Sequence, residues 1–312
     1  MNYLESKVIS EDYEYDGNFW NYMKGKSDTP DILNRTRQSD TGAYALPKAM
    51  NTKAEKAIVK ESAFRKLATV IDCYNTSSKI TKATNDSTAE FVAENGSIPV
   101  VDVKNDFSQM DVLRNKIGAI LRLPTEFVYD ASFDLETYLA NRIGKAFGKA
   151  EDKAYILGNG TSEPTGILDA TAGAEVGLYS AALCADDITD MFFSLDKEYR
   201  DNATWIMNDE TALYLRKTKD DSGNYLWNHS NDTIYGKPVV ICNDMPNADP
   251  GEKPIAFGDF SYYWILRRSP LSIKALKELY ALKGLEGYLA IEFLDGKLIG
   301  RDAVKLLQIS EE

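Results

Sequence analysis

The amino-acid sequence predicts an α+β protein, and three observations lead to this class. A long amphipathic helix is predicted over about 132–157, and several short apolar segments typical of strands follow it. Helices and strands then mix without a regular βαβ repeat, which argues against a doubly wound parallel sheet. The chain has 312 residues, 44% of them hydrophobic, which suffices for one large domain or two ordinary ones.

Charge and cysteine content limit the classes of function. The net charge is −12, so the chain as a whole is a poor electrostatic match for nucleic acid. The N-terminus lacks the features of a signal peptide, and no apolar run approaches the ~20 residues of a membrane span. Cys73, Cys184 and Cys242 match no metal or redox spacing. We expect reduced thiols, buried as small hydrophobic groups, in a soluble protein made in a reducing compartment.

Residues 1–45 are polar and acidic, yet aromatic side chains punctuate them. The first 22 residues hold six: Tyr3, Tyr13, Tyr15, Phe19, Trp20 and Tyr22. A solvated tail is normally poor in aromatics, so this segment is predicted to be an arm that becomes ordered only by lying on something else. The alternative is a frayed terminus that happens to carry a few rings.

Residues 70–112 are predicted to form a long two-stranded excursion rich in Thr, Ser, Lys and Asp. Val101 and Val103 alternate with polar residues, and the same period continues after the excursion at Ile117, Ala119, Leu121 and Leu123. An isolated hairpin is marginal in water because it buries too little apolar area to offset its ordering. The ribbon therefore needs a neighbour, in the same chain or in another.

The helix over 132–157 has the clearest pattern. Its apolar positions recur at spacings of three and four: Leu135, Leu139, Ile143, Ala146, Phe147, Ala150, Ala154 and Leu157. Ser132 is the expected N-cap and Gly158 the expected stop, which gives a helix about 39 Å long. Gly144 and Gly148 mark either a close backbone approach or positions where glycine is tolerated at small cost.

Residues 180–265 are predicted to form a second unit of mixed structure. Within it, helices are expected over 186–199 and 210–217, and strands over 204–208, 237–242 and 256–266. Further strands are expected after it, over 288–297 and 303–309.

Candidate catalytic chemistry is sparse. His229 is the only histidine and lies in a polar loop, so neither a metal site nor a catalytic triad is predicted around it. The glycine-rich segment 158–166 follows a helix and lacks the lysine of a phosphate-binding loop, so it is interpreted as a helix stop with turns. Carboxylate pairs such as Asp186 with Asp187 are expected by chance among 48 acidic residues. No catalytic residue, cofactor or metal ligand is predicted.

Several stretches together resemble the major capsid proteins of tailed phages with the Hong Kong ninety-seven type shell fold. The most specific stretch runs from Asp134-Leu-Glu to Gly158-Asn-Gly-Thr-Ser-Glu-Pro-Thr-Gly-Ile-Leu168, which is similar to the family's long spine helix and its ending. Weaker similarities are Phe19-Trp-Asn-Tyr, Thr41-Gly-Ala-Tyr-Ala-Leu-Pro47, Ser62-Ala-Phe-Arg, Ala89-Glu-Phe-Val and Phe257-Gly-Asp-Phe260. These motifs keep the family's order over roughly residues 19–310.

This resemblance implies an architecture of four parts. They are an N-terminal arm (1–45), an extended β-hairpin loop (71–112), a peripheral domain with the spine helix (46–70, 113–175 and 264–298) and an axial domain (176–263 and 299–312). It also implies that the arm and the loop contact neighbouring subunits. The residues expected in these contacts are Phe19, Trp20, Tyr22, Lys79, Lys82, Glu90, Phe91 and Glu94.

The function implied is that of a shell subunit that forms pentamers and hexamers of an icosahedral capsid around double-stranded DNA. The expected partners are copies of itself, a portal, and scaffolding or cement proteins, with no membrane and no sequence-specific DNA contact. The expected location is the virion, after synthesis in the cytoplasm of the bacterial host. One alternative is a nanocompartment (encapsulin-like) shell around protein cargo, and another is an acidic hydrolase.

Two departures from the family pattern carry expectations of their own. Many relatives begin with a helical scaffolding segment that is removed during maturation, so this sequence is expected to be a mature chain or to use a separate scaffold. Some relatives crosslink a loop lysine to a late asparagine, but the last asparagine here is Asn247. The shell is therefore expected to be held together non-covalently.

Overall fold

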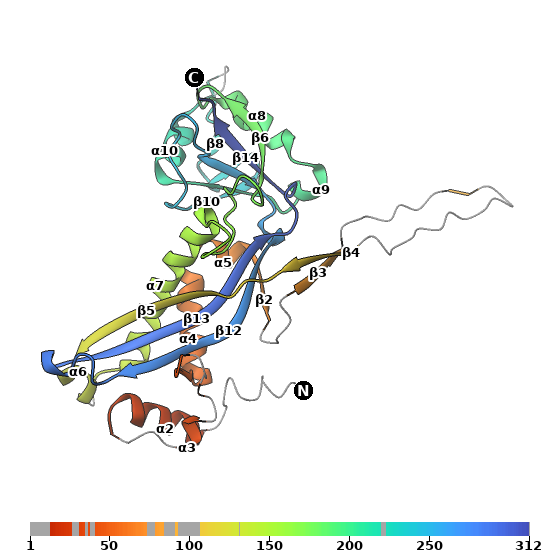
Figure 1. Cartoon of the computed structure of the whole chain (residues 1–312). Coiled ribbons are helices and arrows are strands. Elements are labelled where there is room, and N and C mark those ends of the chain that lie inside the picture. Colours follow the sequence, from red (N-terminus) through yellow and green to blue (C-terminus); the bar gives the residue numbers. More distant parts are fainter. Residues whose placement is uncertain are drawn as a thin grey trace.

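A computed structural model describes residues 13–26, 31–34, 37, 41–73, 79–83, 91–92, 107–130, 132–219 and 223–311. The molecule is elongated, with two units stacked end to end (Figure 1). The lower unit is a five-stranded sheet backed by helices, and we call it the spine unit. The upper unit is a seven-stranded sheet with its own helices, and we call it the head unit.

The sheet of the spine unit gathers strands from distant parts of the chain. Its order is β1-β12-β13-β5, and β2 also pairs with β12. The two long strands β12 and β13 form an antiparallel hairpin in which Tyr263 lies opposite Leu298. The strands are β1 Tyr44–Ala45, β2 Thr69–Asp72, β5 Asn115–Pro124, β12 Tyr263–Leu276 and β13 Leu285–Leu298. The predicted strand 288–297 thus lies inside a longer one.

Helix α7 (Leu135–Leu157) confirms the predicted long helix, although it begins three residues later. The expected cap was wrong, because the side chain of Asp134 accepts the backbone N–H of Thr137 at 3.1 Å. Ser132 instead donates to the carboxylate of Asp130. At the other end, the N–H of Gly158 bonds to the carbonyl of Ala154, so the stop is confirmed.

Helix α4 (Lys48–Glu61) lies directly against α7, and the two glycines of α7 make this contact possible. A Cβ at Gly144 would lie 2.3 Å from the Cβ of Ala57, and one at Gly148 would lie 2.9 Å from the Cβ of Glu61. The sequence left open whether these glycines mark a close approach, and the structure shows that they do.

The remaining helices of the spine unit are short. They are α2 Tyr13–Met23, α3 Asp31–Asn34, α5 Phe64–Leu67, α6 Thr125–Tyr129 and the 3-10 turn η3 Ala281–Lys283. Helix α2 packs on the same hydrophobic core as α4, α7 and the sheet, with Tyr15, Phe19 and Met23 buried. The sequence predicted that the arm lies on a surface without saying which one, and helix α2 of the arm lies on its own chain.

The head unit is built on a sheet with the order β6-β14-β11-β7-β10-β9-β8. Its central strands β7 and β11 are buried throughout, and Trp205 stacks on Phe257 at a ring distance of 4.0 Å. The strands are β6 Glu175–Ser180, β7 Thr204–Met207, β8 Trp227–Asn228, β9 Thr233–Ile234, β10 Lys237–Ile241, β11 Ile255–Gly258 and β14 Val304–Ile309.

The helices of the head unit are α8 Ala185–Ser194, α9 Lys197–Arg200 and α10 Asp209–Lys217. The single helix predicted over 186–199 was wrong, because Leu195 takes an extended conformation and its side chain is buried. The guanidinium of Arg200 donates to the carbonyls of Phe193 and Leu195, which stabilises this break.

The strand predicted over 256–266 is two strands in two different sheets. Strand β11 ends at Gly258, the 3-10 turn η2 (Phe260–Tyr262) follows, and β12 begins in the spine unit. The carboxylate of Asp259 accepts the N–H of Ser261 at 2.9 Å, which fixes the turn. This turn is one of the places where the chain passes between the units.

Strands β3 (Lys79–Ala83) and β4 (Phe107–Asp111) form a two-stranded ribbon in antiparallel register, with Lys79 opposite Asp111. The ribbon projects sideways from the spine unit (Figure 1). The predicted strand at Val101 and Val103 lies outside the described residues.

The cysteines and the histidine differ in exposure. Cys242 is buried and Cys73 is half-buried, but Cys184 is exposed, so the expectation of three buried thiols was wrong. Cys184 lies at the start of α8, where its backbone N–H bonds to Asp187. His229 is exposed, as predicted for a loop residue. Within the described residues, no helix combines the length and apolar character that a membrane crossing needs.

Candidate functional site: a buried polar network at the root of the ribbon

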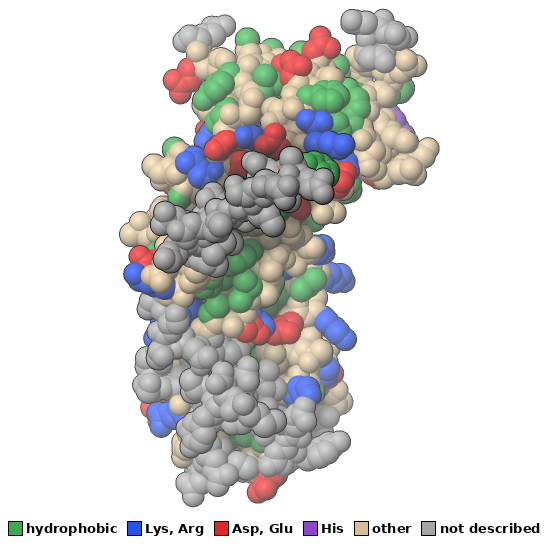
Figure 2. All heavy atoms as spheres, turned by 90° about the vertical axis from the view of Figure 1, so that its right-hand side faces the viewer, with side chains coloured by type: hydrophobic (Ala, Val, Ile, Leu, Met, Phe, Trp, Pro, Cys, Tyr) green, Lys and Arg blue, Asp and Glu red, His purple; other side chains and the backbone are tan. Residues whose placement is uncertain are grey.

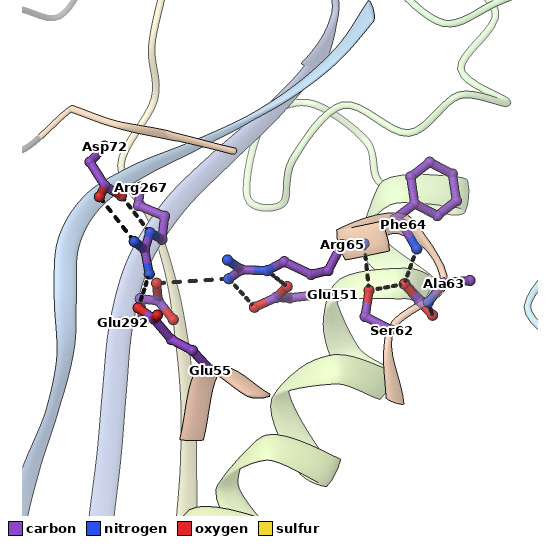
Figure 3. A network of polar contacts seen from close by, with 10 residues as sticks. Glu55, Ser62, Ala63, Phe64, Arg65, Asp72, Glu151, Arg267 and Glu292 are labelled. Atoms are coloured by element: carbon purple, nitrogen blue, oxygen red, sulfur yellow. Dashed lines mark hydrogen bonds and ion pairs between the residues drawn. The ribbon is translucent and has the colours of Figure 1, made fainter. Parts of the chain in front are cut away.

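Polar contacts, several of them between buried charges, join five elements of the spine unit near the end of β2 (Figure 3). The side chains of this network come from α4, the α4–α5 corner, β2, α7 and the β12–β13 hairpin. The charged members are Glu55, Arg65, Asp72, Glu151, Asp152, Arg267 and Glu292.

Asp152 holds the corner between α4 and α5. Its carboxylate accepts the backbone N–H groups of Ala63 at 2.7 Å and Phe64 at 3.2 Å, and the hydroxyl of Ser62 at 2.5 Å. The first N–H groups of a helix have no partner inside the helix, so the carboxylate of α7 supplies what α5 lacks. Burial raises the pKa of Asp152, and these hydrogen bonds oppose that rise.

Glu151, the residue before Asp152 on α7, forms a bidentate ion pair with Arg65 of α5. The guanidinium Nε and Nη2 lie 2.7 and 2.9 Å from the two carboxylate oxygens, and the side chains are 5% and 0% exposed. Burial by itself lowers the pKa of Arg65, but attraction to Glu151 outweighs it and the pKa stands well above its usual value. Arg65 is therefore a fixed positive charge inside the protein.

Glu292 on β13 faces this pair from the sheet. Its carboxylate lies 3.9 Å from Nη2 of Arg65. One of its oxygens has no hydrogen-bond partner within the described part of the chain. Burial raises the pKa of Glu292 to about 7, and repulsion from Glu151 adds to this rise, whereas attraction to Arg65 opposes it. This carboxyl therefore changes its charge near neutral pH.

Arg267 on β12 joins β2 to α4. It binds both oxygens of Asp72 on β2, at 2.5 and 3.0 Å, and one oxygen of Glu55 on α4 at 2.6 Å. Backbone pairing supports the same link, because Asp72 lies opposite Arg267 in the parallel β2–β12 pair. The end of β2, from which the chain continues to the ribbon, is thereby tied to α4 and the sheet.

The arrangement is suited to holding elements together rather than to covalent chemistry. It contains two arginines and five carboxylates, and its one hydroxyl, that of Ser62, donates to the Asp152 carboxylate, which also holds the backbone N–H groups of the α4–α5 corner. Among the described residues, no group of three or more His, Cys, Asp or Glu could hold a metal ion.

The arm residues singled out from the sequence differ in their surroundings. Phe19 is fully buried against its own chain, so its side chain is occupied within the subunit. Trp20 and Tyr22 are partly buried on the same core, and the ammonium group of Lys277 lies 4.3 Å from the centre of the Tyr22 ring.

The loop residues singled out from the sequence are more exposed. Lys79 lies 3.9 Å from Asp111 across the ribbon, and Lys82 donates to the carbonyl of Ile299. Phe91 is fully exposed. Glu90 and Glu94 lie outside the described residues. The described arm residues thus lie on the core of the spine unit, and Lys79 and Lys82 lie on the ribbon.

The buried network was not predicted from the sequence, although one signal pointed to it. Glu151 follows Phe147 by four residues and precedes Tyr155 by four, so it lies on the apolar stripe of α7. An acidic side chain at such a position needs a buried partner. The identity of that partner, Arg65, depends on the packing of α4 and α5 against α7.

Comparisons with known proteins give the family. A model of the phage capsid family matches residues 42–309. The capsid of an empty GTA particle, computed with C5 symmetry, is 28% identical with a TM-score of 0.69, over 80% of this chain and 90% of that one. The capsid of the native GTA particle is 29% identical with a TM-score of 0.64, over the same shares.

A more distant structure shows the fold alone. That of Gordonia phage Cozz is 13% identical with a TM-score of 0.55, over 80% of this chain and 87% of that one. No curated protein matches the chain. Because the family model spans most of the sequence, the chain belongs to the phage capsid family. Its α+β fold is the fold of phage capsid subunits, as the resemblance implied.

Proposed function

We propose that this protein is a shell subunit that assembles into pentamers and hexamers of an icosahedral capsid around double-stranded DNA. The observation that carries the proposal is the family match over residues 42–309. The similarity to the capsid of a GTA particle supports a role in a shell. The assembly is proposed to be non-covalent, since no asparagine follows Asn247 to accept a crosslink from a lysine of the ribbon.

The two units agree with the proposed division of the subunit into an axial and a peripheral domain. The head unit corresponds to the axial domain (176–263 and 299–312), which would surround the centre of each ring. The spine unit corresponds to the peripheral domain (46–70, 113–175 and 264–298). The passage of the chain between sheets at η2 supports the boundary near residue 263. Residues 71–112 would be the extended loop that lies on a neighbouring subunit, and residues 1–45 the arm.

Exposed apolar side chains on the head unit support contacts between copies. Phe193 is 64% exposed and Leu213 is 54% exposed. Tyr214, the residue after Leu213, and Tyr235 are each about half exposed. Phe193 and Tyr235 both lie beside Phe192, with ring distances of 5.3 and 5.5 Å. Large apolar side chains that cluster at the surface are typical of protein interfaces. In a ring of identical subunits, one such surface would meet a different surface of the next copy.

The proposed role needs no catalytic step. Its partners would be copies of this chain, a portal, and scaffolding or cement proteins, and its place would be the virion after synthesis in the host cytoplasm. The network at the root of the ribbon would serve the shell mechanically. Tension on an extended loop would reach α4 through Asp72, Arg267 and Glu55, and α4 packs against α7.

The experiment that tests the ring contacts uses charge substitutions on the head unit. Purified wild-type protein should sediment as capsomers or closed shells. Phe193→Glu and Leu213→Glu should each remain monomeric and folded, because a buried unpaired charge opposes association. Ser230→Glu, a charge on an exposed turn of the same unit, should assemble normally.

Three outcomes would count against the proposal. Unchanged assembly of both apolar-site variants would contradict the ring contacts. Wild-type protein that stays monomeric at every concentration and with its scaffold would contradict a shell role. A ladder of oligomers that resist SDS would contradict non-covalent assembly.

A further inference from the structure

The exposed faces of α4 and α7 carry a charge opposite to that of the whole chain. Each helix exposes four cations, so eight basic side chains stand on this surface of a protein whose net charge is −12. We call this surface the basic face. It is made of Lys48, Lys53, Lys56 and Lys60 on α4 and of Arg142, Lys145, Lys149 and Lys153 on α7.

The acidic side chains of the same two helices are placed differently. Both helices lie wholly within the described residues, and Glu61 is their only exposed acid. Glu151 and Asp152 are buried and bind Arg65 and the α4–α5 corner, and the partly exposed Glu55 binds Arg267. Glu136 is partly buried and pairs with Lys53 at 2.7 Å. The network therefore removes carboxylates of these two helices from the surface, although the half-buried Asp244 lies near Lys149 and Lys153.

The geometry orders the basic side chains into a row along a groove. Arg142, Lys145, Lys149 and Lys153 recur at spacings of three and four, which places them on one side of α7 over about 16 Å. The groove between α4 and α7 has a volume of about 370 Å³, and its lining includes Lys60, Arg142 and Lys145. In Figure 2, Lys and Arg side chains line the right-hand edge of the lower half of the molecule, which is the spine unit.

We infer that the basic face binds the phosphate backbone of the double-stranded DNA that the shell encloses, and that it therefore faces the shell interior. The inference rests on the proposed function. One strand of a duplex carries a phosphate about every 3.4 Å, so the row on α7 matches the length of about five phosphates. Seven of the eight cations are lysines, which act as point charges on phosphate and read no base sequence.

An acidic protein segment is the competing occupant, and the surface favours DNA. A bound peptide normally anchors apolar side chains in pockets. The large apolar side chains exposed on α4 and α7 are Val59 and Leu157 alone. A surface of lysines without apolar anchors is suited to binding the regularly spaced phosphates of a DNA backbone. Each subunit would bind weakly, and the many copies of a shell would add their contacts over one DNA molecule.

The test is DNA binding, as a function of salt, by the whole purified chain kept as unassembled subunits, in which the basic face is open to solvent. Fluorescence anisotropy with a 30-base-pair duplex of random sequence compares wild type with Arg142→Gln/Lys145→Gln/Lys149→Gln. The matched control is Lys197→Gln/Lys217→Gln/Lys283→Gln, which removes the same charge from exposed positions elsewhere. We expect the first variant to bind about tenfold more weakly in low salt and to lower the slope of log affinity against log salt by about 2 to 3. The control should follow the wild type.

Several results would overturn the inference. They are no binding by wild-type protein in low salt, equal losses in both triple variants, or tighter binding of a polyglutamate chain than of DNA. Electron microscopy of the same samples separates this failure from that of the proposed function. Protein that assembles into shells, but whose unassembled subunits bind DNA equally well with and without the three cations, would refute the basic face alone. Wild-type protein that never assembles would refute the shell role.

Discussion

Replacing Glu151 by Gln tests whether the buried ion pair stabilises the subunit. The substitution keeps the size of the side chain and removes its charge. The guanidinium of Arg65 would then stay buried, at 5% exposure, with Glu292 as the nearest carboxylate at 3.9 Å. Removal of one member of a buried pair costs about 3–5 kcal/mol because it leaves an uncompensated charge.

The structure places the expected loss for Glu151→Gln near the lower end of this range. Glu292 has a pKa of about 7, held up in part by repulsion from Glu151. Loss of that repulsion favours ionisation of Glu292, which would then partly neutralise Arg65. We therefore expect the free energy of unfolding to fall by about 3 kcal/mol. Urea denaturation of the unassembled subunit, followed by fluorescence, measures this as a lower midpoint with an unchanged slope.

Two further variants show whether the charge is the cause. Glu136 lies on α7, as Glu151 does, and is the partly exposed partner of Lys53 on α4. Glu136→Gln should lower the free energy of unfolding by about 1 kcal/mol or less. The double variant Arg65→Met/Glu151→Met removes both charges and should regain most of the lost stability. A loss below about 1 kcal/mol for Glu151→Gln, or equal losses for Glu151→Gln and the double variant, would refute the reasoning.

Three other predictions follow from single features. Glu292 is protonated in the folded state at pH values where it is ionised in the unfolded state, because its pKa rises from 4.5 to about 7. The contribution of this carboxyl to stability is therefore full below pH 4.5 and is lost as the pH rises through 7. Between pH 5 and 8, the free energy of unfolding of wild type should fall by on the order of 2–3 kcal/mol relative to that of Glu292→Gln. Urea denaturation that shows the same pH dependence for both proteins would contradict this. Gly144→Ala should lower stability by about 1–3 kcal/mol, because its Cβ would meet Ala57, whereas Gly17→Ala has open space and should not; equal midpoints would contradict the close helix contact. Cys184 should react with a thiol reagent at pH 8 in the native subunit, while Cys242, whose burial raises its pKa to about 12, should react only after unfolding; the reverse order would contradict the exposures.

The parts of the fold that depend on local pattern could be predicted from the sequence. Helix α7 follows from its apolar spacing, and its last residue agrees with the prediction. Its first residue does not, because Ser132 and Asp134 are both good caps and only the structure shows that Asp130 binds Ser132. The choice between two local caps was beyond the sequence pattern.

Breaks inside apolar runs could not be predicted. Residues 256–266 have a continuous strand-like composition, yet the side chain of Asp259 turns the chain from one sheet into the other. The helix predicted over 186–199 ends early because Leu195 enters the core in an extended conformation. In both cases the tertiary environment outweighs local propensity.

The candidate site was the least accessible to sequence reasoning, because its members are far apart in the chain. Glu55 and Arg267 are 212 positions apart and meet only when β12 packs beside α4. For the arm, the sequence indicated part of the answer. The sequence suggested that its aromatics need a surface, but it could not show that Phe19 finds that surface on its own chain.

Electron microscopy of the purified protein tests the central claim most directly. Particles should be imaged alone and with the scaffold of the producing phage, beside their gel-filtration profile. We predict closed icosahedral shells, or rings of five and six subunits. A monomer or small fixed oligomer under every one of these conditions would contradict the shell role. Closed shells that carry protein cargo in place of DNA would contradict the proposed content and favour a nanocompartment.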